Sequence, residues 1–147
     1  MIRIGRAADM GDITRVRTSV TENHLSVEQM AAIGITPEGL IADMQAGDLG
    51  CWVAEAEGEV VGFSMADRRD GNVFALFVLP EHEGKGHGSA LLDVCETWIK
   101  SHGIAEARLD TGAGTKAHAF YLRRGWRLTG EKAGHFAEDD VFRKPLA

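Results

Sequence analysis

Hydrophobic positions follow two different periods along this chain, and segments of the two kinds succeed one another. Alternating or short apolar runs between Gly, Asp and Asn residues predict strands, and apolar positions three and four apart predict helices. The polar stretch 21–34 is compatible with a loop or a short helix. Strands are expected over residues 2–4, 51–56, 60–66, 73–79, 105–110, 126–130 and 140–144. Helices are expected to begin at Asp9, Thr36, Ser89 and Thr115.

Two of the connections between the expected strands are tight turns. Glu57-Gly58-Glu59 joins the first pair and Asp70-Gly71-Asn72 joins the second, as in β-hairpins. The middle of the chain is therefore antiparallel, and the helices before and after it flank the sheet. A chain of 147 residues fits one core. The pattern predicts a single α/β domain over residues 1–147, with a mixed, mostly antiparallel central sheet and flanking helices.

The segment after the expected strand 73–79 carries the clearest chemical signal. Val78-Leu79-Pro80 leads into a loop with glycine at every second position (Gly84, Gly86 and Gly88), and the loop opens directly into a helix. Glycine lets the backbone adopt positive φ and approach a ligand closely. The first N–H groups of a helix are unpaired and lie at the positive end of its dipole. Together these features predict an anion site, most often for phosphate or pyrophosphate.

Two common phosphate loops do not fit this segment. A Walker loop requires Ser or Thr after its lysine, but Lys85 is followed by Gly86. A dinucleotide fold places its glycines after the first strand of a βαβ unit, whereas this loop lies past the middle of the chain. A flexible surface turn is the alternative interpretation. The fixed distance from Val78-Leu79-Pro80 and the amphipathic helix that follows count against it.

The loop resembles the signature of the GCN5-related N-acetyltransferase (GNAT) superfamily. That signature is a hydrophobic strand with Val-x-Pro, then Gln/Arg-x-x-Gly-x-Gly/Ala and a helix, and here the loop reads Glu83-Gly84-Lys85-Gly86-His87-Gly88. A second family element is an aromatic pair ahead of Gly-Phe or Gly-Trp, and here it is Phe120-Tyr121 ahead of Gly125-Trp126. The resemblance extends from about Met1 to Pro145.

The resemblance implies a GNAT-like fold and an enzyme, an N-acetyltransferase that uses acetyl-CoA. The acetyl group would pass directly to a primary amine in a ternary complex, and the amine could belong to a small molecule, a peptide N-terminus or a lysine. By analogy with the family, the backbone of Phe77 and Val78 holds the pantetheine arm. The pyrophosphate is expected on the amides of Glu83, Gly84, Lys85, Gly86, His87, Gly88 and Ser89.

Glu83 departs from the family pattern, which has Gln or Arg at this position. A carboxylate aimed at a pyrophosphate would repel it, so we expect the Glu83 side chain to face away and only its N–H to serve. Lys85 and His87 are expected to offset the lost positive charge.

Tyr121 is the expected general acid, because it is the only tyrosine and the resemblance places its helix beside the cofactor thiol. A phenol with a pKa near 10 is protonated at neutral pH and can donate to a departing thiolate. The alternative is that Tyr121 only packs with Phe120. The general base is not readable, and the candidates flanking the expected acceptor cleft are Glu22, Asp67, Asp70 and His135.

Two other classes of function compete with the enzyme. A CoA-binding sensor without turnover would use the same loop, but it would not need a proton donor such as Tyr121. A kinase-like enzyme is disfavoured because the Walker residues and metal carboxylates are missing. No histidine pair has the spacing of metal ligands, so no metal is expected. Arg123-Arg124 is expected to complement the helix dipole, or else to contact the ribose phosphate of the cofactor.

Charge, cysteine content and hydropathy indicate which partners and which cellular compartment are expected for the protein. A net charge of −6 argues against a nucleic-acid surface and mildly favours cationic acceptors such as amines. Cys51 and Cys95 lack framework spacing and are expected to be reduced and buried, in a cytoplasmic protein. No signal peptide and no apolar run near 18 residues is seen, so no membrane association is expected. A homodimer through the late strands is common in the family and compatible with this sequence.

Overall fold

The alternating segments of the sequence form one sheet in the computed structural model, which describes residues 1–20, 25–112, 115–132 and 139–146. The sheet has seven strands in the order β1-β2-β3-β4-β5-β7-β6. All neighbours are antiparallel except β4 and β5, so the predicted mixed, mostly antiparallel sheet is confirmed. The strands are β1 (Ile2–Ile4), β2 (Leu49–Ala56), β3 (Glu59–Asp67), β4 (Asn72–Val78), β5 (Glu106–Gly112), β6 (Arg127–Lys132) and β7 (Asp139–Pro145).

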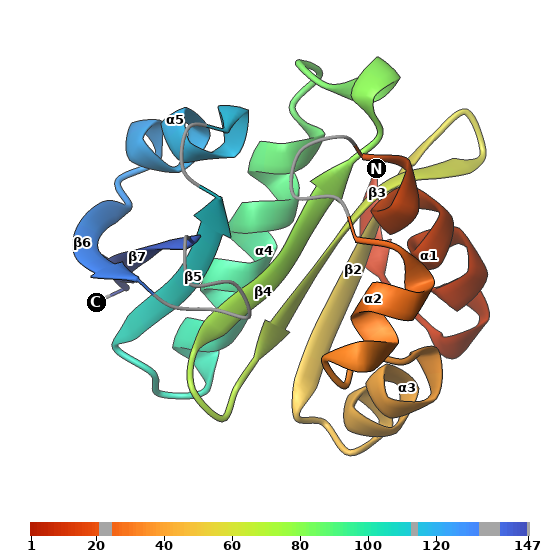
Figure 1. Cartoon of the computed structure of the whole chain (residues 1–147), viewed down its shortest axis with the longest axis horizontal. Coiled ribbons are helices and arrows are strands. Elements are labelled where there is room, and N and C mark those ends of the chain that lie inside the picture. The colour runs from red at the N-terminus through yellow and green to blue at the C-terminus, as the bar shows by residue number, and fades with distance from the viewer. Residues whose placement is uncertain (21–24, 113–114, 133–138, 147) are drawn as a thin grey trace.

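Helices cover both faces of this sheet. The helices are α1 (Met10–Ser19), α2 (Val27–Ala32), α3 (Pro37–Gln45), α4 (His87–Ser101) and α5 (Lys116–Arg123), with short 3₁₀ turns η1 (Ala7–Asp9) and η2 (Pro80–His82). Figure 1 shows α1, α2 and α3 in front of one half of the sheet, α4 behind it, and α5 beside the C-terminal strands. No helix in the described ranges is long and apolar enough to cross a membrane.

Side-chain caps fix where several helices begin. The Thr36 hydroxyl accepts from the Gly39 N–H at 3.1 Å, and Pro37 follows at the first position of α3, as the sequence predicted. Ser26 caps α2 in the same way, so the part of segment 21–34 that the structure describes contains a short helix.

Asp9, the expected cap of α1, has a different role. Its carboxylate accepts from both terminal guanidinium nitrogens of Arg3 at 2.8 and 2.9 Å and from the Arg6 N–H at 2.8 Å. No N–H of α1 reaches that carboxylate. The Arg3 guanidinium holds the pKa of Asp9 down at about 2. The expectation of a side-chain cap at Asp9 was therefore wrong, because the guanidinium on β1 competes successfully for the carboxylate.

The parallel neighbours β4 and β5 separate almost as soon as they meet. Their only register pair is Asn72 with Arg108, and the Arg108 N–H donates to the Gly71 carbonyl at 2.9 Å. On its other edge, β4 stays paired with β3 to its end, with one register shift that leaves Phe74 as an extra residue. Such a bulge bends a strand and increases its local twist. Figure 1 shows β4 and β5 diverging, with α4 visible between them.

The hydrogen-bond pattern determines which backbone groups of β4 face the gap beside β5. The Leu79 N–H donates to the Val61 carbonyl at 2.8 Å, so this pair is hydrogen-bonded across β3 and β4. Antiparallel ladders alternate, which directs the N–H and C=O of Phe77 toward β3 as well. The N–H and C=O of Leu76 and Val78 therefore point toward the gap.

Burial of large apolar side chains on both sides of the sheet holds the two halves together. Trp126, Phe142 and Leu92 are almost completely buried in the cluster formed by α4, α5 and the C-terminal strands. Cys51 and Cys95 are buried free thiols, as predicted. Burial raises the pKa of each thiol to about 12, so both remain protonated and unreactive at neutral pH.

Gly71 lies where β4 meets β5, and we expect the stability of the fold to depend on a glycine at this position. Its φ of +76° disfavours any side chain, and a Cβ there would lie 2.9 Å from the Glu106 carbonyl oxygen. We expect Gly71→Ala to lower the unfolding free energy by about 2–4 kcal/mol. Gly58→Ala is the matched control, with φ of +80° and open space around the Cβ, and should cost about 1 kcal/mol. Urea denaturation of both variants measures this, and equal losses would contradict the close approach.

Candidate functional site

The glycine loop adopts the conformations that only glycine takes easily. Gly84 has φ of +76° and Gly86 has φ of +88°, and a Cβ on either residue would meet no atom within 4 Å. Gly86 directly precedes α4 and occupies the N-cap position without a capping side chain. The loop therefore presents bare backbone to open space at the start of a 15-residue helix.

Several N–H groups of this loop have no acceptor among the residues that the structure describes. The first helical bond of α4 runs from the Ala90 N–H to the Gly86 carbonyl, at 3.1 Å. The N–H groups of Gly86, His87, Gly88 and Ser89 precede this bond and have no carbonyl within the helix. No acidic residue lies in the first turn of α4. This cluster of donors at the positive end of a helix dipole fits an anion.

Glu83 at the start of the loop is occupied by other contacts. Its carboxylate Oε2 lies 3.3 Å from the Lys116 Nζ on α5, and its N–H donates to the Pro80 carbonyl at 3.3 Å. The side chain is thus turned to a cation, but the N–H that was expected to serve the ligand is already engaged. Burial, together with the positive charges of the N-terminus and Lys85, lowers the pKa of His87. The cation beside the Glu83 carboxylate is Lys116. The expected role of Lys85 and His87 toward the pyrophosphate stays a prediction.

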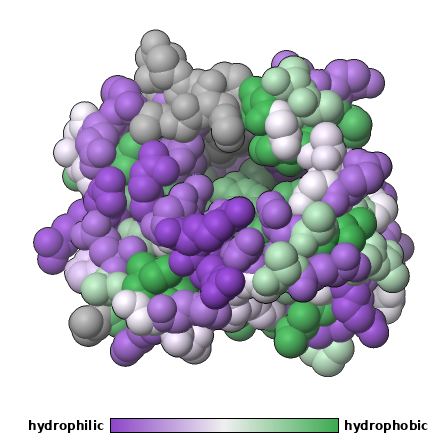
Figure 2. Space-filling view, turned by 90° about the horizontal axis from the view of Figure 1, so that it is seen from below, coloured by the Kyte–Doolittle hydropathy of each residue, from purple (hydrophilic) through white to green (hydrophobic). Residues whose placement is uncertain are grey.

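A cavity of about 350 Å³ lies between the helices on the front face and the gap beside β4. The surface is hollowed between the two halves of the molecule, with hydrophobic residues on the floor of the hollow (Figure 2). Five consecutive residues of β4, Val73 to Phe77, form one wall. The front helices and the residues next to them contribute Met10, Ile13, Thr14, Arg17, Leu25, Val27, Met30, Thr36, Pro37 and Leu40. The opposite side contributes Asp110, Thr111, Ala117, Tyr121 and Asp139.

Tyr121 both packs in the core and lines this cavity. Its ring makes edge-type contacts with Trp126 and Phe120, at centroid distances of 6.0 and 5.4 Å. Burial raises the pKa of the Tyr121 phenol above its usual value near 10. The phenol therefore stays protonated through the physiological range, as a proton donor must. Packing and proton donation, the two interpretations of this residue, are both compatible with its position.

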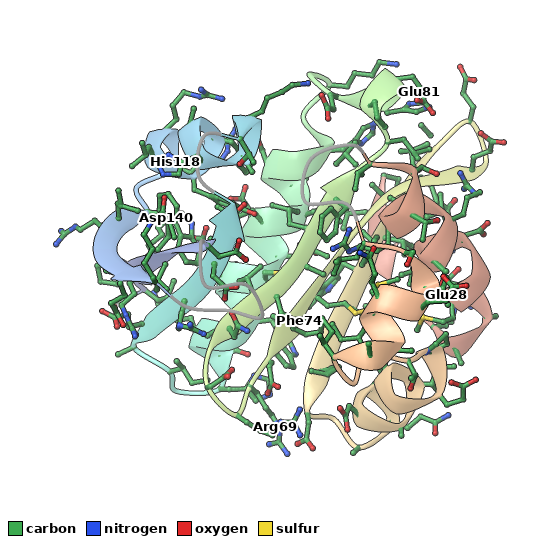
Figure 3. All side chains as sticks on the ribbon, in the orientation of Figure 1. Glu28, Arg69, Phe74, Glu81, His118 and Asp140 are labelled. Carbon is green, nitrogen blue, oxygen red and sulfur yellow. The ribbon has the colours of Figure 1, made fainter. Side chains whose placement is uncertain are left out.

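Two of the four sequence-based candidates for a general base, Asp67 and Asp70, are not among the residues that line the cavity. The Asp67 carboxylate accepts from the Arg69 side chain at 2.8 Å, and the Asp70 carboxylate accepts from the Asn72 N–H at 3.0 Å. Asp67 ends β3 and Asp70 lies in the turn that follows, which Figure 3 shows at the lower edge of the molecule around Arg69. The other two candidates, Glu22 and His135, lie outside the described residues.

Three charged side chains of the cavity, Arg17, Asp110 and Asp139, were missed by sequence reasoning. The guanidinium of Arg17 lies 4.1 Å over the Phe77 ring, and its Nη1 is buried without a hydrogen-bond partner. Burial lowers the pKa of Arg17 to about 10, so it remains cationic at pH 7. Asp110 lies on the opposite wall, with its nearest cation, the Arg108 Nη1, 3.8 Å away. Arg17 falls four residues after Ile13, on the apolar side of α1. A charged residue on the apolar side of a helix was the signal in the sequence that could have identified Arg17 as a site residue.

His118 and Arg124, both on or next to α5, lie outside the cavity lining. The His118 side chain is only 21% exposed, and its Nε2 lies 3.3 Å from the Asp140 carboxylate (Figure 3). Arg124 places its guanidinium 4.7 Å over the Phe120 ring. Within the described ranges, no group of three His, Cys, Asp or Glu side chains is arranged to hold a metal ion.

The sheet opens between the parallel strands β4 and β5, and the glycine loop lies at the start of α4 beside this opening, which agrees with the GNAT-like fold that the resemblance implies. The model of the acetyltransferase (GNAT) family matches residues 13–126. The chain therefore belongs to the acetyltransferase (GNAT) family, whose acyl donor is acetyl-CoA, and the predicted resemblance is confirmed.

Relatives and solved structures agree with this assignment. Probable N-acetyltransferase 14 of Danio rerio is 34% identical over 100 residues, which cover 64% of this chain but only 36% of that protein. The chain thus spans about a third of that relative. Two crystal structures share the fold over almost their whole length. A GNAT-family acetyltransferase of Staphylococcus aureus Mu50 has a TM-score of 0.82, with 16% identity and 100% and 99% of the two chains covered. The PaiA N-acetyltransferase of Thermoplasma acidophilum, in complex with coenzyme A, has a TM-score of 0.79, with 21% identity and 99% and 98% covered.

The titration of Tyr121 can be read directly, because the chain has one tyrosine. Its pKa is raised by burial, so folding favours the neutral phenol. The associated stability is complete below pH 10 and is lost as pH rises beyond it. We expect no tyrosinate absorbance at 295 nm in the folded protein at pH 11, whereas the urea-unfolded chain should ionise near pH 10. Ionisation of both forms at the same pH would contradict the buried position.

Proposed function

We propose that this chain is an acetyl-CoA-dependent N-acetyltransferase that acetylates a primary amine by direct transfer in a ternary complex. The observation that carries the proposal is the gap between β4 and β5, which leads from free N–H groups at the start of α4 to a cavity lined by Tyr121. Family membership supports the acyltransferase chemistry. The coenzyme A complex of the Thermoplasma protein supports the donor, because that protein shares the fold.

The donor would be held by backbone groups along its whole length. The N–H and C=O of Val78 and Leu76 point toward the gap and would pair with the pantetheine arm as a neighbouring strand does. Phe77 faces β3 with its backbone, so we assign it a contact through its ring, which lines the cavity. The pyrophosphate would lie on the N–H groups of Gly84, Lys85, Gly86, His87, Gly88 and Ser89.

The chemistry requires two proton movements besides the transfer itself. The neutral amine attacks the thioester carbonyl, a C–N bond forms, the C–S bond breaks, and the amine proton leaves to solvent. We propose that the Tyr121 phenol donates the proton that the departing thiolate takes up. The phenol carries its proton throughout the physiological range, and its packing against Trp126 fixes its direction.

Calorimetric titration with acetyl-CoA tests the donor site. We expect wild-type protein to bind acetyl-CoA in the micromolar range and not to bind ATP. Gly86→Ala should weaken acetyl-CoA binding by roughly 10-fold, because a Cβ and altered backbone would disturb the N–H cluster.

Gly103→Ala is the matched control at the other end of α4, with φ of +79° and equally open surroundings. It should lose similar stability and leave acetyl-CoA binding unchanged. Absence of acetyl-CoA binding by the wild type would refute the proposed function, and equal affinities of the two variants would refute the loop assignment. Binding without thiol release for any amine would point to a sensor.

Tyr121→Phe tests the proton donor. Phenylalanine keeps the ring contacts with Trp126 and Phe142, so we expect an unchanged melting temperature and an unchanged KM for acetyl-CoA. The value of kcat should fall roughly 100-fold, because the leaving thiolate loses its proton source. Thiol release in steady-state assays measures the effect. Turnover equal to that of the wild type would exclude the acid role and leave Tyr121 as a packing residue.

A further inference from the structure

Arg17 is a cation that nothing in the described part of the chain neutralises. Its Nη1 is buried without an acceptor, and the contact of its guanidinium is with the face of the Phe77 ring. The neighbouring Arg15 on α1 is different, because it donates to the Val60 carbonyl at 2.8 Å and lies near Asp12. A buried guanidinium without a carboxylate loses hydration and gains little in return. Because no described residue offers an acceptor to Nη1, the position of Arg17 on the cavity wall suits an acceptor group on a bound ligand.

The opposite wall of the same cavity carries the opposite charge. Asp110 on β5 lines it beside Thr111 and Tyr121. Between the two walls the lining is mainly apolar, with Phe63, Met65 and Leu76 from the sheet and Met30 and Leu40 from the helices. A molecule that fits this cavity has a cationic end toward Asp110 and Tyr121, an apolar body, and an anionic end toward Arg17.

We propose that Arg17 binds a carboxylate on the acceptor, so that the substrate is a primary amine that also carries a carboxylate and an apolar body. This inference rests on the proposed function, and it names the substrate class of that site. The planar guanidinium, stacked on Phe77, presents two parallel donors that match a carboxylate. A phosphate suits the cavity less well, because its second charge would have no cation and would lie in a cavity with acidic residues.

We expect Arg17→Met to make the protein more stable and to weaken its binding of the acceptor. Methionine fills similar apolar space without a charge, so removing the uncompensated cation should raise the melting temperature by roughly 1–4 °C. The same change should raise the acceptor KM by roughly 10- to 100-fold, because a charge-assisted contact is lost. A residue with a purely structural role would lower the melting temperature when replaced.

The experiment compares amines that differ only in the carboxylate. The first set of probes is L-phenylalanine, L-phenylalaninamide and phenethylamine, and the second set is L-leucine, L-leucinamide and isopentylamine. A comparison of O-phosphoethanolamine with ethanolamine tests whether the site prefers a phosphate. Thiol release and competition by 3-phenylpropionate, which has the carboxylate but no amine, are measured on wild-type protein, Arg17→Met and Arg17→Lys. We expect the wild type to prefer the carboxylate member of each set, Arg17→Met to lose that preference, and Arg17→Lys to retain only part of it.

Arg15→Met is the matched control, because it removes the same charge from the same helix outside the cavity lining. It should leave the carboxylate preference unchanged. The inference would be overturned if the wild type showed no preference for the carboxylate in turnover and competition, or if it preferred the phosphate probe. Acetyl-CoA binding by the same protein would still support the proposed function. A weaker acetyl-CoA affinity of Arg17→Met, with acceptor KM unchanged, would also overturn the inference, since Arg17 would then serve the donor.

Discussion

The loss of hydrogen bonding between β4 and β5 after a single register pair is the constraint on which the site depends. Asn72 and Arg108 mark the last place where the sheet is continuous across this boundary. Beyond it, the bulge at Phe74 turns β4 away while β3 continues to hold its other edge. The sheet stays in one piece because α4 packs against β2, β3, β4 and β5 from behind. The opening and the unpaired backbone groups of Leu76 and Val78 follow from this separation, and the glycine loop lies between the end of β4 and the start of α4.

The secondary structure was largely predictable because its signals are local. The turn glycines, the cap at Thr36 and the glycines before α4 each act within a few residues, and each was found in the expected place. The separation of β4 from β5 has no comparable local signal in the sequence. Phe74 carries no glycine or proline that would mark a bulge, and Gly71 looks like an ordinary turn residue until Glu106 packs against it.

The cavity was much less predictable than the loop, because its lining comes from segments far apart in the sequence. Arg17 and Asp110 are 93 positions apart by their numbers and meet across one cavity only once the sheet has formed. Competition between side chains was equally unpredictable from the sequence. Arg3 forms an ion pair with Asp9, which therefore does not cap α1, and Lys116 forms an ion pair with Glu83. Asp67 and Asp70 looked like catalytic candidates by residue type, but the backbone and arginine of their own turn satisfy them.

The gap beside β4 also gives this protein an edge in the interior of its sheet. Unpaired N–H and C=O groups along a strand are a template for any extended chain, and folded proteins usually cover or charge such edges. Here the edge at Leu76 and Val78 has no lysine or proline of its own, and it lies next to an apolar cavity. A bound donor with amide groups along its arm would cover that edge as a strand does. The cofactor would then protect the protein against aggregation, and the empty form would be the one at risk of unwanted strand pairing.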